Sequence, residues 1–305
     1  MIYHCDVVDG LRKLESNSVD CIILDPPYNI GKNYGNNRTK LEMDEYVSWA
    51  QTWLTECERV LKPNGTMYVY GFSEVLAHLS VNIKLNQRWL VWHYTNKTVP
   101  SLKFWQRTHE SILCCWKEDK TFYRDQVRVP YTDRFIKGYK NKKRKRPSTK
   151  GRFGDSEETL YTVNDKGALP RDVICSPSLA GGAGSKERFF YSPSMKKLFT
   201  SRGKKEFLKN DGVNDFISHP TQKPTKVTET LLDACIPENF CDIKSLNNPV
   251  VVIPFAGTGS ECLVCEERGY NWTAFEINKD YVDMGNILVK NGFPKNPPKT
   301  KGENE

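Results

Sequence analysis

The stretch CIILDPPYNIG, starting at Cys21, joins an aliphatic run to an acid, two prolines and a tyrosine. Buried strands are short apolar runs, and prolines end them because proline has no N–H for the ladder. We therefore expect a strand over Val19–Leu24. Ligands of open α/β sheets bind at the carboxyl edge. Four candidate catalytic residues follow the strand: Asp25, Pro26, Pro27 and Tyr28.

These residue types suit the binding of an amine on a planar ring. A carboxylate and a carbonyl can accept the two hydrogens of an amine, and the prolines hold the carbonyls in a fixed extended turn. An aromatic ring offers a face on which a base can stack. The alternative, an ordinary cap or turn acid at Asp25, does not explain the prolines and the tyrosine.

A second stretch, IPFAGTGSECL, places Gly257 and Gly259 between an apolar run and a helix-like segment. Such a turn lets a ligand approach the backbone and the positive end of the helix. Glu276 ends the next apolar run. Its spacing from Gly257 in the sequence is about the spacing at which nucleotide-binding folds place an acid that binds ribose. The loop lacks the GK[ST] of a P-loop. A nucleoside that carries a carboxylate therefore fits better than a triphosphate, and a plain tight turn is the alternative.

Strand and helix patterns alternate on both sides of a long irregular segment, which is typical of an α/β layer. The expected strands are Met1–Val7, Val19–Leu24, Thr66–Gly71, Arg88–Tyr94, Ser111–Lys117, Pro249–Phe255 and Asn271–Ile277. The expected helices are Asp44–Leu61, Glu74–Ile83, Thr225–Cys235, Gly259–Arg268 and Tyr281–Lys290.

The segment from about Glu118 to Ser218 loses this periodicity, and we expect it to be an insertion outside the layered core. SLAGGAGSKER and SPSMKKLFTSRGKK within it are predicted to be mobile loops. The run KGYKNKKRKRPSTKGR carries much of the net charge of +8 and contains no acid. It suits a polyanion such as nucleic acid, although a solvated loop explains the run alone about as well.

Composition excludes other classes. The chain has ten cysteines, mostly inside apolar runs, so a disulfide framework is not expected. Cys262 and Cys265 could join Cys235 and Cys241 in a zinc site, but an i,i+3 pair on a buried helix face is the simpler interpretation. No apolar run approaches the roughly 18 residues of a membrane span. We expect a cytoplasmic protein without a membrane segment.

Taken together, DPPY, HPTQKP (His219–Pro224), FAGTG and the following acid resemble the amino-group DNA methyltransferases, which methylate adenine N6 or cytosine N4. DPPY precedes FAGTG, as in the permuted β group of that family. The resemblance implies a Rossmann-like S-adenosylmethionine-dependent fold with a mostly parallel seven-stranded sheet. It also implies a circular permutation, in which the N-terminal strand continues the sheet after the strand of Glu276.

The resemblance implies three regions. Residues 1–117 and 216–293 form the catalytic and cofactor-binding domain, residues 118–215 an inserted target-recognition region, and residues 294–305 a disordered tail. Within the insertion, the resemblance and the charge point to five phosphate contacts: Lys142, Lys143, Arg144, Lys145 and Arg146. We expect the segment Asn29–Arg38 to be a mobile lid over a flipped base.

By resemblance, the cofactor is S-adenosylmethionine, with S-adenosylhomocysteine as product and no metal. Asp6 would reach the adenine, Glu276 the ribose, and Gln222 and Lys223 the methionyl end, while His219 supports the loop. An ordinary turn acid at Asp6 and an ordinary helix start at Thr221 and Pro224 are the alternatives. The remaining cofactor contacts come from the second motif: Phe255, Ala256, Gly257, Thr258 and Gly259.

One departure concerns the cofactor site. The family usually has an acid directly before PF, where this chain has Ile253. The site therefore lacks one expected polar contact, which puts the cofactor affinity in question.

The expected function is sequence-specific methylation of adenine N6 in double-stranded DNA. Cytosine N4 is the nearest alternative, although Asp25 favours adenine because cytosine enzymes more often carry Ser at this motif position. An RNA amine, or a catalytically silent DNA-binding or partner subunit, are further alternatives. The resemblance also implies a bacterial or phage source and association with the nucleoid, and it allows a homodimer and a cognate restriction endonuclease.

Overall fold

The computed structural model describes residues 1–31, 40–96, 100–139, 143–145, 158–160, 163–179, 186–211, 213–238, 240 and 248–297. The chain divides into two compact units. The larger comprises Met1–Phe122 and Asp172–Glu305, and the smaller comprises Tyr123–Arg171. The roles assigned above to three sequence regions remain a proposal.

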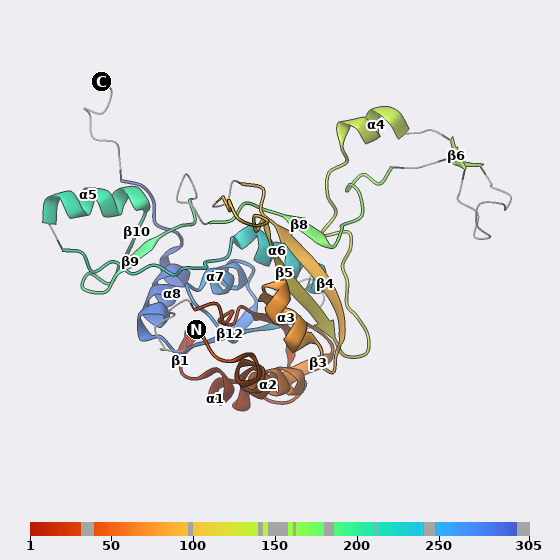
Figure 1. Ribbon diagram of the computed structural model, residues 1–305. Helices are drawn as coiled ribbons and strands as arrows, with labels where there is room; N and C mark the ends of the chain where they lie inside the picture. The colour runs from red at the N-terminus through yellow and green to blue at the C-terminus, as the bar shows by residue number, and fades with distance from the viewer. Residues whose placement is uncertain are drawn as a thin grey trace, which may run out of the picture. The chain divides into compact units, whose positions relative to one another are not determined.

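The larger unit is built on an eight-stranded sheet (Figure 1). Its strand order is β1 (Ile2–His4), β12 (Asn271–Glu276), β11 (Val250–Ile253), β2 (Val19–Leu24), β3 (Leu61–Gly71), β5 (His109–Trp116), β4 (Asn86–His93) and β8 (Val173–Cys175). Only β5 runs against the other strands, since its pairings with β3 and β4 are antiparallel and the remaining pairings are parallel. The predicted mostly parallel α/β sheet is therefore confirmed, and all seven predicted strands belong to it.

The eighth strand, β8, lies inside the segment that we expected outside the layered core. Val91 pairs with Val173, and His93 with Cys175. That expectation is therefore wrong for β8. The strand was missed because three residues are too few to show an alternating pattern, and its position depends on the free edge of β4.

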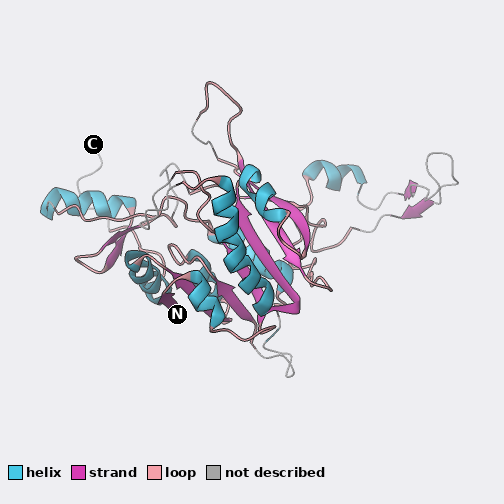
Figure 2. Cartoon of the chain, turned by 60° about the horizontal axis from the view of Figure 1, so that its bottom comes forward, coloured by secondary structure: helices cyan, strands magenta, loops and turns pink. Residues whose placement is uncertain are grey.

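Helices cover both faces of the sheet, as the helices over the strands in Figure 2 illustrate. One face packs against α1 (Val7–Arg12), α2 (Met43–Val60) and α3 (Ser73–Ser80), and the other against α6 (Thr225–Cys235) and α7 (Ser260–Glu267). Successive residues of β2 alternate between the two cores: Cys21 and Ile23 face α6 and α7, whereas Ile22 and Leu24 face α2. Burial on both faces explains why the strand reads as a continuous apolar run.

The first and the last strand of the chain pair in the sheet. Ile2 of β1 pairs with Ala274 of β12, and His4 pairs with Glu276, both in parallel register. The predicted permutation is thus confirmed: the strand that follows β12 in space is the first strand of the chain. Helix α8 (Lys279–Asn291) connects to this edge, because Asn286 accepts the Ile2 N–H and donates to the Ile2 carbonyl.

Two local predictions are wrong. The first strand ends at His4 rather than Val7, because Asp6 caps α1 and accepts the Val8 N–H at 2.8 Å. The stretch SPSMKKLFTSRGKK is not a loop, since it contains β10 (Lys197–Phe199) and the beginning of α5 (Ser201–Asp211). Strand β9 (Phe190–Ser192) pairs with β10, and Tyr191 and Leu198 pack in one core cluster with Met284 of α8. This packing partner is about 90 residues away in sequence, which local periodicity cannot reveal.

The smaller unit contains α4 (Asp133–Tyr139) and the antiparallel pair β6 (Lys143–Lys145) and β7 (Glu158–Leu160). Tyr131 stacks on Phe135 at a ring distance of 4.8 Å. Lys142 and Arg146 of the predicted phosphate contacts lie outside the described residues, and so does the predicted lid from residue 32 onward. Residues 298–305 of the predicted tail lie outside them as well.

Candidate active site

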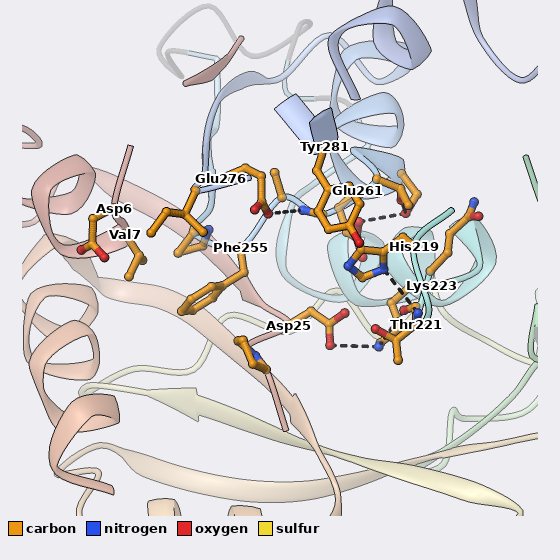
Figure 3. Close-up of a pocket in the computed structure, with 18 of the residues that line it drawn as sticks. Asp6, Val7, Asp25, His219, Thr221, Lys223, Phe255, Glu261, Glu276 and Tyr281 are labelled. Atoms are coloured by element: carbon orange, nitrogen blue, oxygen red, sulfur yellow. Dashed lines mark hydrogen bonds and ion pairs between the residues drawn. The ribbon is translucent and has the colours of Figure 1, made fainter. Parts of the chain in front are cut away.

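A cavity of about 300 Å³ opens at the carboxyl edge of β2, β11 and β12. Figure 3 shows the side chains that line it. Four carboxylates contribute to its wall: Asp6, Asp25, Glu261 and Glu276. The single lysine or arginine among the described lining residues is Lys223. The wall is therefore acidic, which favours a ligand that carries positive charge.

Asp25 follows β2 directly, and its carboxylate is held by two donors. Lys223 Nζ lies 2.9 Å from Asp25 Oδ1, and the Tyr28 hydroxyl donates to the same oxygen at 2.8 Å. Both contacts involve Oδ1, which leaves Oδ2 as the acceptor available to a ligand. Burial raises the pKa of Asp25, and the neighbouring Lys223 opposes this shift without cancelling it.

Lys223 lies between two acids. Its side chain is 1% exposed, and its ammonium also lies 3.4 Å from Glu110 Oε2. Burial by itself would lower the pKa of Lys223, but Asp25 and Glu110 outweigh it and raise the pKa above its ordinary value. Lys223 is therefore a buried, charged group whose compensation depends on both carboxylates.

Glu110, in β5, was missed by the sequence analysis. It accepts the Tyr94 hydroxyl at 2.6 Å, and it shares the single proton of the Tyr28 hydroxyl, 2.8 Å away, with Asp25 Oδ1. Burial alone would raise the pKa of Glu110, but Lys223 and the two tyrosines outweigh it and hold the pKa below its ordinary value. A buried acid within the apolar strand HESILCCW was the one signal that could have identified it.

The carbonyl groups of Pro26 and Pro27 differ in their hydrogen bonding. The Pro27 carbonyl accepts the Tyr46 hydroxyl at 2.8 Å, whereas no hydrogen bond of the described residues ends on the Pro26 carbonyl. The ring of Tyr28 is 2% exposed and packs edge-on against Phe72 at 5.0 Å. In this structure Tyr28 therefore orients Asp25 through its hydroxyl, and its predicted stacking on a base remains a prediction that requires the ring to be uncovered.

The glycine loop has left-handed backbone at both predicted positions, with φ of 50° at Gly257 and 77° at Gly259. Gly259 is the N-cap of α7. Glu276, at the end of β12, accepts the N–H of Gly257 at 2.9 Å through one oxygen and that of Asn278 at 2.8 Å through the other. Burial raises the pKa of Glu276, although these N–H groups oppose the shift. The carboxylate is thus fixed beside the loop, where a polar ligand group could reach it.

Other predicted cofactor residues lie on the same cavity: Asp6, Gln222, Phe255, Ala256 and Thr258. The side chain of Asp6 caps α1, as described above. If Asp6 also binds a ligand, the same carboxylate caps the helix and contacts the ligand. Gln222 donates to the Glu187 carbonyl at 2.8 Å, which ties the HPTQKP segment to the chain before it. Pro224 is the N-cap of α6, as its alternative interpretation predicted.

Ten of the thirteen predicted catalytic and cofactor residues therefore meet at one cavity. Pro26, Tyr28 and Gly259 lie beside it rather than in its wall, and the predicted phosphate contacts belong to the smaller unit. The sequence analysis missed Trp49 and Tyr281, which line the cavity, and Glu261. Glu261 directly follows the glycine motif, but a helix-start acid gives no sign that it faces a cavity.

The cysteine pair behaves as predicted for a buried helix face, since Cys262 and Cys265 are both fully buried in α7. The described residues contain no group of three His, Cys, Asp or Glu side chains arranged for a metal ion. In the part of the chain that the structure describes, no helix is long and apolar enough to cross a membrane.

The chain is similar to known methyltransferases over nearly its whole length. A family model described as DNA methylase, of the N6 and N4 methyltransferase type, matches residues 19–287. Type II methyltransferase M.HpaI of Haemophilus parainfluenzae is 26% identical over 296 residues, which cover 94% of this chain and 73% of that protein. DNA adenine methyltransferase YhdJ of Escherichia coli (strain K12) is 25% identical over 292 residues, which cover 93% and 80%.

Two solved structures share the fold. The cytosine-N4-specific PvuII DNA methyltransferase superposes with a TM-score of 0.59 at 16% identity, over 96% of this chain and 87% of that one. A DNA modification methylase from Thermus thermophilus, described as putative and solved in complex with S-adenosyl-L-methionine, superposes with a TM-score of 0.51 at 15% identity, over 95% and 92%. The predicted Rossmann-like methyltransferase fold is thereby confirmed.

Proposed function

Because the chain belongs to the DNA methylase family of N6 and N4 amino-methyltransferases, we propose that it methylates adenine N6 at a specific sequence in double-stranded DNA. The observation that carries the proposal is the acidic cavity in which Asp25, at the tip of β2, faces the glycine loop of the adjacent strand β11. An amine bound at Asp25 and a methyl donor bound at the loop would share one cavity.

The cavity fits S-adenosylmethionine, a nucleoside that carries positive charge. When bound, S-adenosylmethionine supplies an electrophilic methyl group. The cavity volume of about 300 Å³ is at the lower end of the range for small-molecule sites. Glu276 would hold the ribose hydroxyls, Asp6 the adenine, and the amides around Thr258 the carboxylate. The acidic wall matches the charge of this ligand better than that of a nucleotide phosphate.

The amine of adenine is a poor nucleophile because its lone pair is delocalised into the ring. Asp25 Oδ2 and the Pro26 carbonyl would accept the two amine hydrogens and turn the lone pair out of conjugation. Lys223 and Tyr28 hold the other carboxylate oxygen, so the acceptor is oriented before the base arrives. Preorganised acceptors of this kind, together with in-line positioning, can contribute most of the acceleration.

The target amine lies inside a duplex, so the base must leave the stack to reach Asp25. The basic segment of the smaller unit is the proposed phosphate-binding surface, and the aromatic residues of the same region are candidates for contacts with unstacked bases. Asp at the first motif position supports adenine as the target. Cytosine N4 is the competing target, and one structural relative is described as cytosine-N4-specific.

The decisive experiment is long-read modification mapping of DNA from cells that express the chain. Adenine N6 signals in one recurrent sequence are the expected result. Cytosine N4 signals would overturn the adenine assignment while leaving the reaction class intact. Absence of any modified base would favour a silent DNA-binding or partner subunit.

The matched variant is Asp25→Asn, which keeps the shape of the side chain and removes the charge. We expect the rate of labelled methyl transfer to unmodified DNA to fall by about 100-fold or more, because the main acceptor of the amine is weakened. Binding of S-adenosylmethionine, measured by calorimetry, should change by less than about threefold. Retention of normal transfer by Asp25→Asn would show that the proposed mechanism is wrong. Asp9→Asn, on the exposed side of α1, serves as the control.

A further inference from the structure

Glu261 is a buried carboxylate that the mechanism above does not use. It lies in the first turn of α7, is 4% exposed, and belongs to the cavity wall (Figure 3). Removing an ionised carboxylate from water is costly unless a cation or several donors compensate for it. The position therefore requires an explanation.

The other three carboxylates of the wall already have partners. Asp6 accepts a backbone N–H at the start of α1, and Glu276 accepts two backbone N–H groups. Asp25 is paired with Lys223 and is the proposed acceptor of the amine. A cationic group of a ligand that bound any of these three carboxylates would share it with the partner or the role just described.

Glu261 has a weaker set of partners. Ser260 donates its hydroxyl to Glu261 Oε2 at 2.9 Å, and the Ser260 hydroxyl is itself 3.1 Å from that of Thr258. Among the described residues, no lysine, arginine or histidine forms an ion pair with Glu261. Burial and the neighbouring Asp25 raise the pKa of Glu261 to about 7. The carboxylate is thus held by the Ser260 hydroxyl and faces the cavity. Among the described residues no cation is in direct contact with it, and the charge of Lys223 acts on it only from a distance.

An acid at the start of a helix does not account for this arrangement. Such an acid stabilises a helix by about 0.3–1 kcal/mol through the helix dipole, and it does so at exposed positions. Burial of an uncompensated carboxylate costs several times more. The position is therefore better explained by a ligand that brings the missing charge.

We propose that Glu261 binds the ammonium group of the methionine moiety of S-adenosylmethionine. This inference rests on the proposed function, since it names a further contact of the same cofactor. It also accounts for Ile253, which is 1% exposed in the core at the position where the family usually has an acid. In this chain the carboxylate comes from the helix after the glycine loop instead of from the strand before it.

The test compares three ligands with the full chain: S-adenosylmethionine, its analogue with a hydroxyl in place of the amino group, and 5′-methylthioadenosine. Glu261→Gln keeps the shape and the Ser260 contact but removes the charge. We expect it to weaken binding of S-adenosylmethionine by about 10- to 100-fold, as for a hydrogen bond between charged groups. Binding of the two ligands without an ammonium should change by less than about threefold.

Glu267→Gln, an exposed acid on the same helix, is the matched control and should leave all three affinities unchanged. Glu261→Asp retains the charge on a shorter side chain, and we expect an intermediate loss confined to S-adenosylmethionine. Equal weakening of all three ligands by Glu261→Gln, or no weakening of any, would overturn the inference. Failure of the unaltered chain to bind any of the three ligands would instead overturn the proposed cofactor, and the inference with it.

Discussion

At the scale of single residues, the site is organised by the pairing of one buried lysine with two buried acids. Lys223 neutralises part of the charge of Asp25 and Glu110, and two tyrosine hydroxyls donate to Glu110. Breaking a buried pair by removing one partner is strongly destabilising, because the remaining charge is left uncompensated. The stability of the larger unit should therefore depend on Lys223.

We predict that Lys223→Met lowers the free energy of unfolding by about 3–5 kcal/mol in denaturant titrations. Adding Glu110→Gln to this variant should recover part of the loss, because one of the two uncompensated acids is then removed. Lys226→Met is the control: Lys226 is exposed and pairs with Glu229 at 3.6 Å, so its removal should cost less than about 1 kcal/mol. A loss below that level for Lys223→Met would contradict the prediction.

The pKa of Glu261 predicts a pH dependence of cofactor affinity. A cation binds the ionised form, which is populated above a pKa of about 7. Affinity for S-adenosylmethionine should therefore be highest between about pH 7 and about pH 8, where the ligand's own α-ammonium begins to lose its proton. Below about pH 7 it should fall by up to about tenfold per pH unit. The other titratable groups near Glu261 are Asp25, Lys223, Tyr70, Cys262, Cys265 and His219.

Measuring the affinity by calorimetry between about pH 5.5 and about pH 8.5, a window centred on about pH 7, separates the contributions of these groups. Burial raises the pKa of Tyr70, Cys262 and Cys265, which keeps them neutral in this window, and Lys223 stays charged. A contribution of Asp25 persists in Glu261→Gln, whereas that of Glu261 disappears. Identical pH profiles for the unaltered chain and Glu261→Gln would refute the assignment.

At the scale of elements, the glycine loop is positioned by the packing of α7 against α8. A Cβ on Gly259 would lie 2.8 Å from the Gly285 Cα, and the left-handed φ of 77° disfavours any side chain. The sequence analysis assigned this glycine to the approach of a ligand. The structure adds a second reason, which is the close approach of two helices.

We predict that Gly259→Ala lowers the free energy of unfolding by about 2–5 kcal/mol, combining left-handed strain and overpacking. Gly269→Ala is the matched control, because Gly269 has a φ of 70° but no atom within 4 Å of its Cβ position. Gly269→Ala should lower the free energy of unfolding only by the cost of a left-handed backbone with a side chain, about 1–2 kcal/mol. Equal losses in the two variants, measured by urea unfolding, would show that the contact with Gly285 is unimportant.

At the scale of the whole molecule, the proposed division of labour separates chemistry from DNA binding. All candidate catalytic and cofactor residues belong to the larger unit, whereas the proposed phosphate contacts belong to the smaller. Phosphate contacts contribute affinity without sequence information and depend strongly on salt. Their loss should therefore affect DNA binding alone.

We predict that replacing the basic run with alanine weakens duplex binding at least about tenfold at physiological salt. The salt slope should fall by about one for each phosphate that is no longer neutralised. The substituted residues are Lys142, Lys143, Arg144, Lys145 and Arg146. Binding of S-adenosylmethionine should stay unchanged. Alanine at Arg12 and Lys13, exposed on the larger unit, is the control. An unchanged salt slope in the substituted chain would place the phosphate-binding residues elsewhere.

The sequence by itself determined the architecture of the site region. Apolar runs predicted seven of the eight strands of the sheet, and the residues after Val19–Leu24 and Pro249–Phe255 identified the two strand tips that meet. These features are local, because strand periodicity and proline or glycine punctuation depend on neighbouring residues. The motif order also predicted that the first strand pairs with β12.

Only the tertiary structure decided which side chains meet. Lys223 pairs with Asp25 and Glu110, which come from distant parts of the chain, and Glu261 faces the cavity although its sequence position resembles an ordinary helix start. Strand β8 and the packing of β9 and β10 near α8 likewise depend on surfaces built by other elements. Such contacts follow from how helices pack on both faces of a sheet. A residue's partner is therefore set by the assembled layers and is not encoded in the pattern around it.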